Sequence, residues 1–133
     1  MLRTRLAGSS MLVALALVGG CDTRVIEGPV FQPQVINVPN DFAFQASALD
    51  GVNSVREYTW QSDGSAATVN QLPNNLTGTV SLFILDGAGT QVYQHALTDT
   101  GTFTTSTGVA GSWTVRVRME DASGSVTFHV RRP

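Results

Sequence analysis

The sequence is poor in cysteine and in charge. Its single cysteine among 133 residues cannot form an internal disulfide, a Cys-x-x-Cys redox pair or a thiolate zinc site. Charged residues make up 14% of the chain and the formal net charge is −2, so the basic surface that nucleic-acid binding needs is missing. The hydrophobic fraction of 42% is nevertheless too high for a disordered chain. At this length the composition predicts one folded domain with no nucleic-acid partner.

The N-terminus is typical of an export signal. Arg3 and Arg5 form a short positive segment, residues Met11–Val18 (MLVALALV) are apolar, and small residues follow. The apolar run is far shorter than the roughly 20 residues that cross a bilayer as a helix. Residues 1–20 are therefore predicted to be a signal peptide and not a membrane span.

The cysteine comes directly after this segment. Leu17-Val18-Gly19-Gly20-Cys21 resembles the lipobox of bacterial lipoproteins, in which an apolar residue and two small residues precede a cysteine that is lipidated and becomes the new N-terminus. The resemblance implies that acyl chains on Cys21 hold an exported protein to a bacterial membrane. It leaves open the inner or the outer membrane, and the periplasmic or the surface side. An ordinary cleaved signal followed by a chance cysteine is the alternative.

Residues 21–40 are expected to form a lipidated cysteine and a flexible tether. Pro29, Pro33 and Pro39 lie in this segment, and proline disfavours both helices and central strands. Val35–Val38 can form a short edge strand within it. The folded domain is then expected to cover residues 41–133.

Residues 41–133 show the alternation of apolar and polar residues that is typical of β-strands. Glycine, asparagine, aspartate and serine separate these short runs, and no helix pattern stands out. The pattern predicts an all-β protein, a small antiparallel β-sandwich of roughly seven or eight strands. A barrel is the second choice. The strongest expected strands are 42–46, 55–61, 79–85, 90–97, 112–120 and 125–131, and weaker ones are 67–71 and 102–106.

Two β-hairpins are predicted. Asp86-Gly87-Ala88-Gly89 is a strong turn signal because aspartate and glycine tolerate positive φ, and the register of the strands beside it stays open by one residue. Residues 121–124 (DASG) are predicted to be the turn of the last hairpin. That turn would place Met119 opposite Val126 and bring two apolar strand faces together.

Two segments of this domain carry a resemblance. They are Val80–Gly89 (VSLFILDGAG), before and within the first predicted turn, and Ala110–Val117 (AGSWTVRV), nearer the C-terminus. With them, residues 42–131 resemble the pre-peptidase C-terminal domain and related bacterial Ig-like sandwiches. Those domains normally accompany a secreted hydrolase, and no hydrolase sequence is present in this chain. The resemblance implies a non-catalytic accessory or binding module.

Few residues carry catalytic chemistry. No Gly-x-Ser-x-Gly elbow is present, and the two histidines, His95 and His129, are too few for a zinc site without other ligands. Asp86, Glu120 and Asp121 lie at predicted turns, where they either form the turns or contribute to a calcium site. Turn formation is favoured, so no enzymatic activity, metal or cofactor is expected.

The aromatic residues offer a first candidate for ligand contact. Tyr58 and Trp60 share a predicted strand face with Arg56, so they belong either to the core or to a surface patch that contacts a ligand. Trp113 shares a face with Val115 and is expected in the core.

The basic residues of the predicted last hairpin are a second candidate. They would project from one face, and they are Arg116, Arg118, His129 and Arg131. Like charges across strands destabilise a sheet, so acidic side chains are expected to compensate them. The residues available for this are Asp41, Glu57 and Glu120. The alternative is a patch for phosphate-bearing envelope polymers or for an acidic partner.

Together these features predict a membrane-anchored envelope lipoprotein whose non-catalytic β-sandwich acts by binding or by structural association. The alternative is a carbohydrate- or polymer-binding accessory module of an exported system. The expected partners are a membrane, through the N-terminal lipid, and an envelope protein or glycan.

Overall fold

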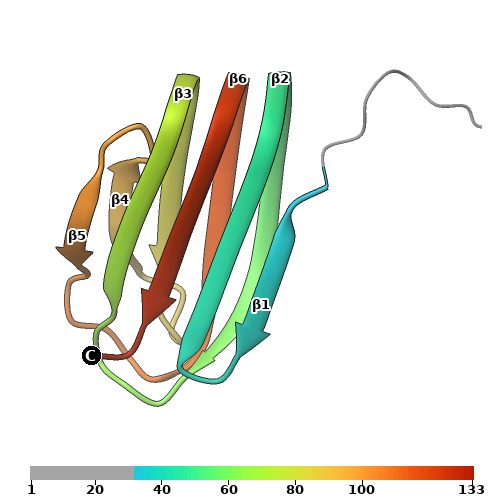
Figure 1. The fold of residues 1–133 in the computed structure, drawn as a ribbon. Coiled ribbons are helices and arrows are strands. Elements are labelled where there is room, and N and C mark those ends of the chain that lie inside the picture. The colour runs from blue at the N-terminus through green and yellow to red at the C-terminus, as the bar shows by residue number, and fades with distance from the viewer. Residues whose placement is uncertain (1–31) are drawn as a thin grey trace, which may run out of the picture. The chain divides into compact units, whose positions relative to one another are not determined.

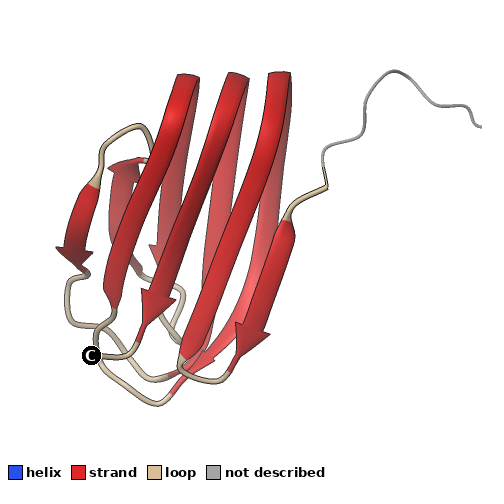
Figure 2. Cartoon of the chain, in the orientation of Figure 1, coloured by secondary structure: helices blue, strands red, loops and turns tan. Residues whose placement is uncertain are grey.

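The computed structural model describes residues 32–133. The predicted signal peptide, Cys21 and most of the predicted tether lie outside the described residues. The described chain forms six strands, all paired antiparallel (Figure 1, Figure 2): β1 (Gln34–Val38), β2 (Asp41–Ser62), β3 (Thr68–Leu85), β4 (Gln91–Ala96), β5 (Gly101–Thr104) and β6 (Gly111–Arg131). Among these residues there is no helix long and apolar enough to cross a membrane.

β2, β3 and β6 are long because each runs through both layers of a sandwich. They lie side by side in the order β2-β6-β3, and each bends back at the same end of the molecule (Figure 1). The front layer contains β1, β5 and residues 41–46, 68–74 and 125–131; the back layer contains β4 and residues 54–62, 79–85 and 111–120. The predicted antiparallel sandwich is confirmed, with fewer strands than expected because three of them serve both layers.

Each bend repeats one backbone pattern. A residue with positive φ is followed three positions later by a glycine with positive φ. The pairs are Ala48 and Gly51 in β2, Asn75 and Gly78 in β3, and Asp121 and Gly124 in β6. The registers between the long strands shift at the same places, as they do at β-bulges. Left-handed residues and bulges therefore carry each strand from one layer to the other without a loop.

The bends of β3 and β6 fit closely against each other. A Cβ atom on Gly78 would lie 2.2 Å from the carbonyl oxygen of Asp121, and one on Gly124 would lie 2.3 Å from the carbonyl oxygen of Asn75. Real Cβ atoms do not approach backbone oxygens so closely. Glycine is thus required at both positions for space as well as for φ.

The predicted hairpin at residues 121–124 is wrong. Met119 pairs with Ser54 and Val80, and no hairpin joins it to Val126. Residues 121–124 form the bend of one continuous strand, β6. A bulged bend shifts the inward-facing positions by one residue, as a four-residue hairpin loop does, so the apolar pattern is the same in both arrangements.

The other predicted hairpin is confirmed. Asp86–Gly89 joins β3 to β4, and the N–H of Gly89 donates to the carbonyl oxygen of Asp86. A register shift after Ile84 places the side chains of both Val92 and Tyr93 in the core. This irregularity is the reason that alternation alone left the register open.

The short strand expected near residue 35 is also present. β1 pairs with β2 from Gln34 opposite Gln45 to Val38 opposite Asp41, and it forms one edge of the front layer. The sheet therefore begins inside the segment that was expected to be a flexible tether.

The core lies between the two layers and combines aliphatic and aromatic side chains. Phe44 and Phe128 stack with their ring centroids 5.0 Å apart, and Trp60 meets Trp113 edge-on at 5.9 Å. Phe42, from the same layer as Phe44, is also fully buried. Burial of such large side chains is the main source of stability in a domain of this size.

Candidate functional site

Trp60 belongs to the core and not to a ligand-binding surface. Its side chain is fully buried, and its indole N–H donates to the carbonyl oxygen of Val38 at 3.1 Å. Trp113 is equally buried, as expected, and its indole N–H donates to the carbonyl oxygen of Val109 at 2.8 Å. The surface interpretation of Trp60 is therefore wrong, because the strand face that it shares with Arg56 and Tyr58 points between the layers.

Tyr58 also points between the layers, but it is only half-buried. Its ring packs against Phe42 and Phe44, with centroid distances of 5.5 Å and 6.2 Å. Its hydroxyl group is buried and has no hydrogen-bond partner within residues 32–133. The ring therefore does not lie on either outer face of the sandwich.

The basic residues of β6 do not form one patch. Arg116 and Arg118 lie in the back layer, opposite Glu57 and Val55 of β2. His129 and Arg131 lie in the front layer, in the part of β6 beyond the bend. The prediction of a single basic face is wrong because it assumed a hairpin where the strand crosses to the other layer.

The expected compensation of these arginines is confirmed. Arg116 bonds to Glu57, Arg118 to Glu120 at 2.7 Å, and Arg131 to Asp41 at 3.2 Å. The exposed fractions of these side chains lie between 36% and 58%. Solvent-exposed ion pairs contribute little to stability, so their main effect is to neutralise the two outer faces.

A row of side chains crosses the outer face of the back layer, and sequence reasoning did not identify it. The register places Glu57 of β2 beside Arg116 of β6, Arg116 beside Phe83 of β3, and Phe83 beside Gln94 of β4. We call these four residues the back-face row. Phe83 is half-buried although it faces outward. The signal that could have found it is the run 79–85, which is apolar on both faces.

A second row lies next to the back-face row, toward the Asp86 hairpin. It runs through Thr59, Thr114, Leu85 and Gln91 on the same four strands. The side-chain amides of Gln91 and Gln94 bond to each other at 3.3 Å and so link the two rows. An aromatic ring and an aliphatic side chain are therefore surrounded by planar polar groups on this face.

The outer face of the front layer has a different chemistry. Its central row consists of Ile36, Ala43, His129, Asn70 and Thr102, on five neighbouring strand segments. The amide of Asn70 donates to the hydroxyl of Thr102 at 2.9 Å, and Nδ1 of His129 lies 3.2 Å from the guanidinium of Arg131. This row therefore combines hydrogen-bonding side chains with two aliphatic ones, Ile36 and Ala43.

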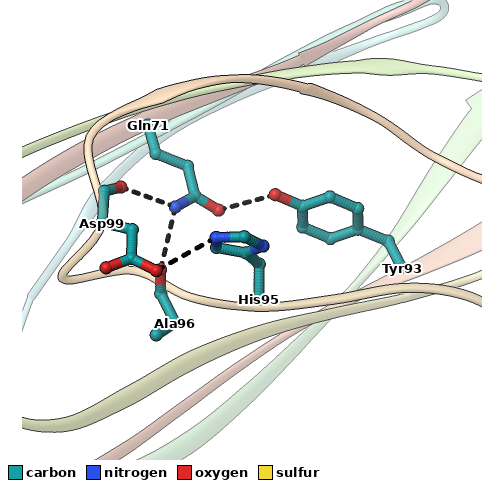
Figure 3. A network of polar contacts seen from close by, with 5 residues as sticks. All are labelled: Gln71, Tyr93, His95, Ala96 and Asp99. Atoms are coloured by element: carbon teal, nitrogen blue, oxygen red, sulfur yellow. Dashed lines mark hydrogen bonds and ion pairs between the residues drawn. The ribbon is translucent and has the colours of Figure 1, made fainter.

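A buried polar network lies at the side of the sandwich between β4 and β5 (Figure 3). Gln71 is fully buried, and its amide donates to the carbonyl oxygens of Ala96 and Asp99 at 2.9 Å and 2.8 Å. The hydroxyl of Tyr93 donates to Oε1 of Gln71 at 2.8 Å. Burial, together with the charge of Asp99, raises the pKa of Tyr93. The network joins a front-layer strand to a back-layer strand and fastens the loop between β4 and β5.

His95 lies beside this network. Its Nε2 is 3.1 Å from the carboxylate of Asp99, and its ring packs on Phe103 with centroids 4.1 Å apart. His129 lies on the outer front face, so the two histidines do not meet. Within residues 32–133 there is no group of three or more His, Cys, Asp or Glu side chains that could hold a metal ion.

Asp86 is a turn-forming residue, as expected. Its carboxylate is buried and accepts hydrogen bonds from the backbone N–H groups of Ala88, Thr90 and Val109, each at 2.8 to 2.9 Å. The bonds from Thr90 and Val109 are the main reason that the pKa of Asp86 is lowered. Asp86 therefore fastens the loop before β6 to the β3–β4 hairpin.

Comparisons with known proteins do not identify a family. No family model matches the chain, and no curated protein matches it. The resemblance to the pre-peptidase C-terminal domain therefore stays a prediction. Among solved structures, one described as "CBM4 structure and function" is similar with a TM-score of 0.38 and 11% identity, over 74% of this chain and 77% of that one. A likeness of that size does not carry an assignment.

Proposed function

We propose that this chain is a non-catalytic binding module that takes up a polysaccharide on the outer face of its back layer. The observation that supports this most is the back-face row, in which half-buried Phe83 lies between Arg116 and Gln94. The module is proposed to be exported and held to a bacterial membrane through lipid on Cys21.

The chemistry of the back-face row suits a sugar ring. Ligand sites combine aromatic or apolar surface with a few polar groups that fix orientation. Phe83 supplies a partly exposed ring, and Arg116 and Gln94 supply planar donors on either side of it. Cross-strand neighbours have Cβ atoms about 5 Å apart, so side chains from these three strands can contact the same ring of a sugar.

A polymer fits this face better than a small molecule does. The face is formed by regular strands, and the second row repeats the arrangement of an apolar residue among polar ones. Neighbouring strands of a sheet lie about 4.8 Å apart. A chain of sugars lying across the strands can therefore contact several side chains of a row at once.

The binding proposal is tested with Phe83→Ala in affinity electrophoresis against a panel of soluble bacterial polysaccharides. We expect the variant to bind the retained polymer at least about tenfold more weakly, because a central aromatic contact is lost. The matched control is Leu72→Ala, which removes an exposed aliphatic side chain from the outer front face and should leave binding unchanged. Gln94→Ala is a second variant on the exposed part of the row, for the case that Phe83→Ala lowers the melting temperature.

A phosphate-bearing polymer is the second candidate, because Arg116 and Arg118 still share the outer back face. Its binding would weaken strongly with added salt and with the double variant Arg116→Gln, Arg118→Gln. Binding of a neutral polysaccharide would not change with salt. If none of these variants alters retention of any polymer, the back-face row is not the binding site.

The anchor is proposed on the sequence alone, from the segment Leu17–Cys21 that resembles a lipobox. Stable anchoring by acyl chains needs more than one chain, which a diacylated cysteine supplies. Expression in a bacterium followed by fractionation tests it. The unchanged protein should sediment with membranes and the Cys21→Ser variant should not; a Cys21→Ser protein that stays with membranes would contradict the anchor.

A further inference from the structure

We propose that the free edge of β1 pairs with β1 of a second copy of this chain, so that the two front layers form one continuous sheet. β1 is the outermost strand at one edge of the front layer (Figure 1). An edge strand presents a row of unpaired backbone N–H and C=O groups, with which another strand can pair.

The hairpin between β1 and β2 shows which backbone groups are free. Val38 and Asp41 pair directly across the turn Pro39-Asn40, where Asn40 has a φ of 67°. The pair that closes a hairpin with a two-residue loop is hydrogen-bonded. Alternate residues of β1 therefore direct their backbone groups toward β2, and Val35 and Asn37 direct theirs away from it. Within residues 32–133 these outward groups have no hydrogen-bond partner.

The same groups determine the register of the proposed pairing. An antiparallel arrangement centred on Ile36 lets Val35 of each copy exchange both backbone hydrogen bonds with Asn37 of the other. Pro33 and Pro39 occupy the next outward positions and have no N–H, so they limit the ladder to these residues. The resulting two-fold interface is self-complementary, as closed dimers require.

The side chains of β1 favour this pairing. Ile36 and Val38 are 61% and 46% exposed, although both are aliphatic, and β1 contains no charged residue. In the proposed register Ile36 meets Ile36 of the second copy at a non-hydrogen-bonded position, where side chains are closest. Val38 then lies opposite Gln34 of the second copy, so that both exposed aliphatic side chains gain cover.

The edge that β2 forms in the back layer does not favour self-pairing. Thr59 and Gln61 of β2 use their outward carbonyl oxygens to accept bonds from the Asn37 side chain and the Asn40 backbone. Antiparallel self-pairing centred on Glu57 would place two carboxylates opposite each other, and centring it on Arg56 would do the same with two guanidinium groups. Like charges directly opposite destabilise a sheet. The uncharged edge of β1 therefore fits a second copy better than this edge of β2 does.

Disulfide trapping tests this inference. In the full chain carrying Cys21→Ser, Ile36→Cys would be the only cysteine, and the proposed register brings it close enough to its copy for a disulfide. A mild oxidant should then give a covalent dimer on a non-reducing gel. The matched control is Leu72→Cys, because Leu72 is 49% exposed on the same layer but lies on the inner strand β3. Leu72→Cys should remain monomeric.

Sedimentation equilibrium of the Cys21→Ser chain gives a second readout. The average mass should rise with protein concentration, and Ile36→Lys should abolish that rise without changing the melting temperature, because two lysines would face each other across the two-fold axis. A mass that stays monomeric at all concentrations, an Ile36→Lys chain that still associates, or equal cross-linking of the two cysteine variants would each overturn the proposal. None of these results depends on polysaccharide binding.

Discussion

The chain passes between the two layers of the sandwich in two different ways at the same end of the molecule. β2, β3 and β6 cross as continuous bent strands, whereas β4 and β5 are joined across the layers by the loop 97–100 (Figure 1). All three bends rely on left-handed backbone, and those of β3 and β6 rely also on glycines without room for a Cβ atom. The loop relies on a buried glutamine that binds two of its carbonyl oxygens (Figure 3).

The bent strands and the loop 97–100 should differ in how well they tolerate substitutions. At a close backbone contact no other residue can replace glycine, because a side chain would add atoms where a carbonyl oxygen already lies. A side-chain hydrogen bond can be lost at a cost that depends on which groups remain buried without a partner. Substitutions should therefore destabilise the bends most and the loop less, and each of the following predictions tests one step of that order.

The largest effect is expected from Gly124→Ala. Its Cβ atom would lie 2.3 Å from the carbonyl oxygen of Asn75, at a φ of 106° that alanine disfavours. We expect the free energy of unfolding, measured by urea denaturation, to fall by about 3 kcal/mol or more. Gly78→Ala, on the facing bend, should behave in the same way. A loss below about 1 kcal/mol at both positions would show that the bends can separate without cost.

A smaller effect is expected from Gln71→Leu. Leucine fills a similar volume but leaves the buried hydroxyl of Tyr93 without its acceptor, and it removes the amide donor to the carbonyl oxygens of Ala96 and Asp99. We expect a loss of about 2 to 3 kcal/mol in urea denaturation. The double variant Gln71→Leu, Tyr93→Phe should lose less than the sum of the two single variants, since the second change removes one of the orphaned groups. Strictly additive losses would argue against a shared network.

Sequence patterns predicted the strands well and their three-dimensional connection poorly. Alternation located β2, β4 and the two halves of β6, because residues that face the core recur with period two wherever one face is buried. The bend at Asp121–Gly124 has the composition of a hairpin turn, and it shifts the apolar pattern by the same single residue. Only the pairing of Met119 with Ser54 and Val80, far away in the sequence, distinguishes the two arrangements.

The error in the predicted basic patch follows from that one bend. Arg116 and Arg131 were expected on one face because a hairpin would place them there, and the bend puts them on opposite faces of the sandwich. The ion pairs of these arginines were nevertheless predicted correctly, since opposite charges on neighbouring strands attract in any arrangement that pairs β2 with β6. Phe83 was missed because residues 79–85, which are apolar on both faces, were predicted only to form a strand, and neither face was considered as a ligand surface.

Acid should weaken a second loop that crosses between the layers, residues 105–110 before β6. The backbone bonds from Thr90 and Val109 favour the ionised form of Asp86, so its pKa in the folded chain lies below the ordinary value of 3.8. The stabilisation by this carboxylate is complete above pH 3.8 and is lost as the pH falls through the lower, folded-state pKa.

The Asp86→Asn variant tests this prediction. It should be less stable than the unchanged protein near neutral pH, and the difference should shrink as the pH falls below 3.8. Asp50→Asn is the matched control, because Asp50 is exposed and its substitution should not alter the pH profile in this way. A difference that stays constant from pH 7 to pH 2 would mean that the ionised form of Asp86 is not the form that the loop prefers.

The smallest effect is expected from Gly89→Ala. This variant separates the two reasons for glycine in the bends of β3 and β6, which are the positive φ and the lack of space for a Cβ atom. Gly89 has a φ of 84°, as left-handed as the glycines of the bends, but a Cβ atom there would meet nothing within 4 Å. The cost of the left-handed backbone, about 1 to 2 kcal/mol, is partly offset because alanine restricts the unfolded chain by about 0.4 to 1 kcal/mol. We expect a net loss of about 1 kcal/mol in urea denaturation. If Gly89→Ala destabilised the protein as much as Gly124→Ala, the strain of positive φ would explain the effect at both sites. The close contact between β3 and β6 would then not be the reason that their bends do not tolerate alanine.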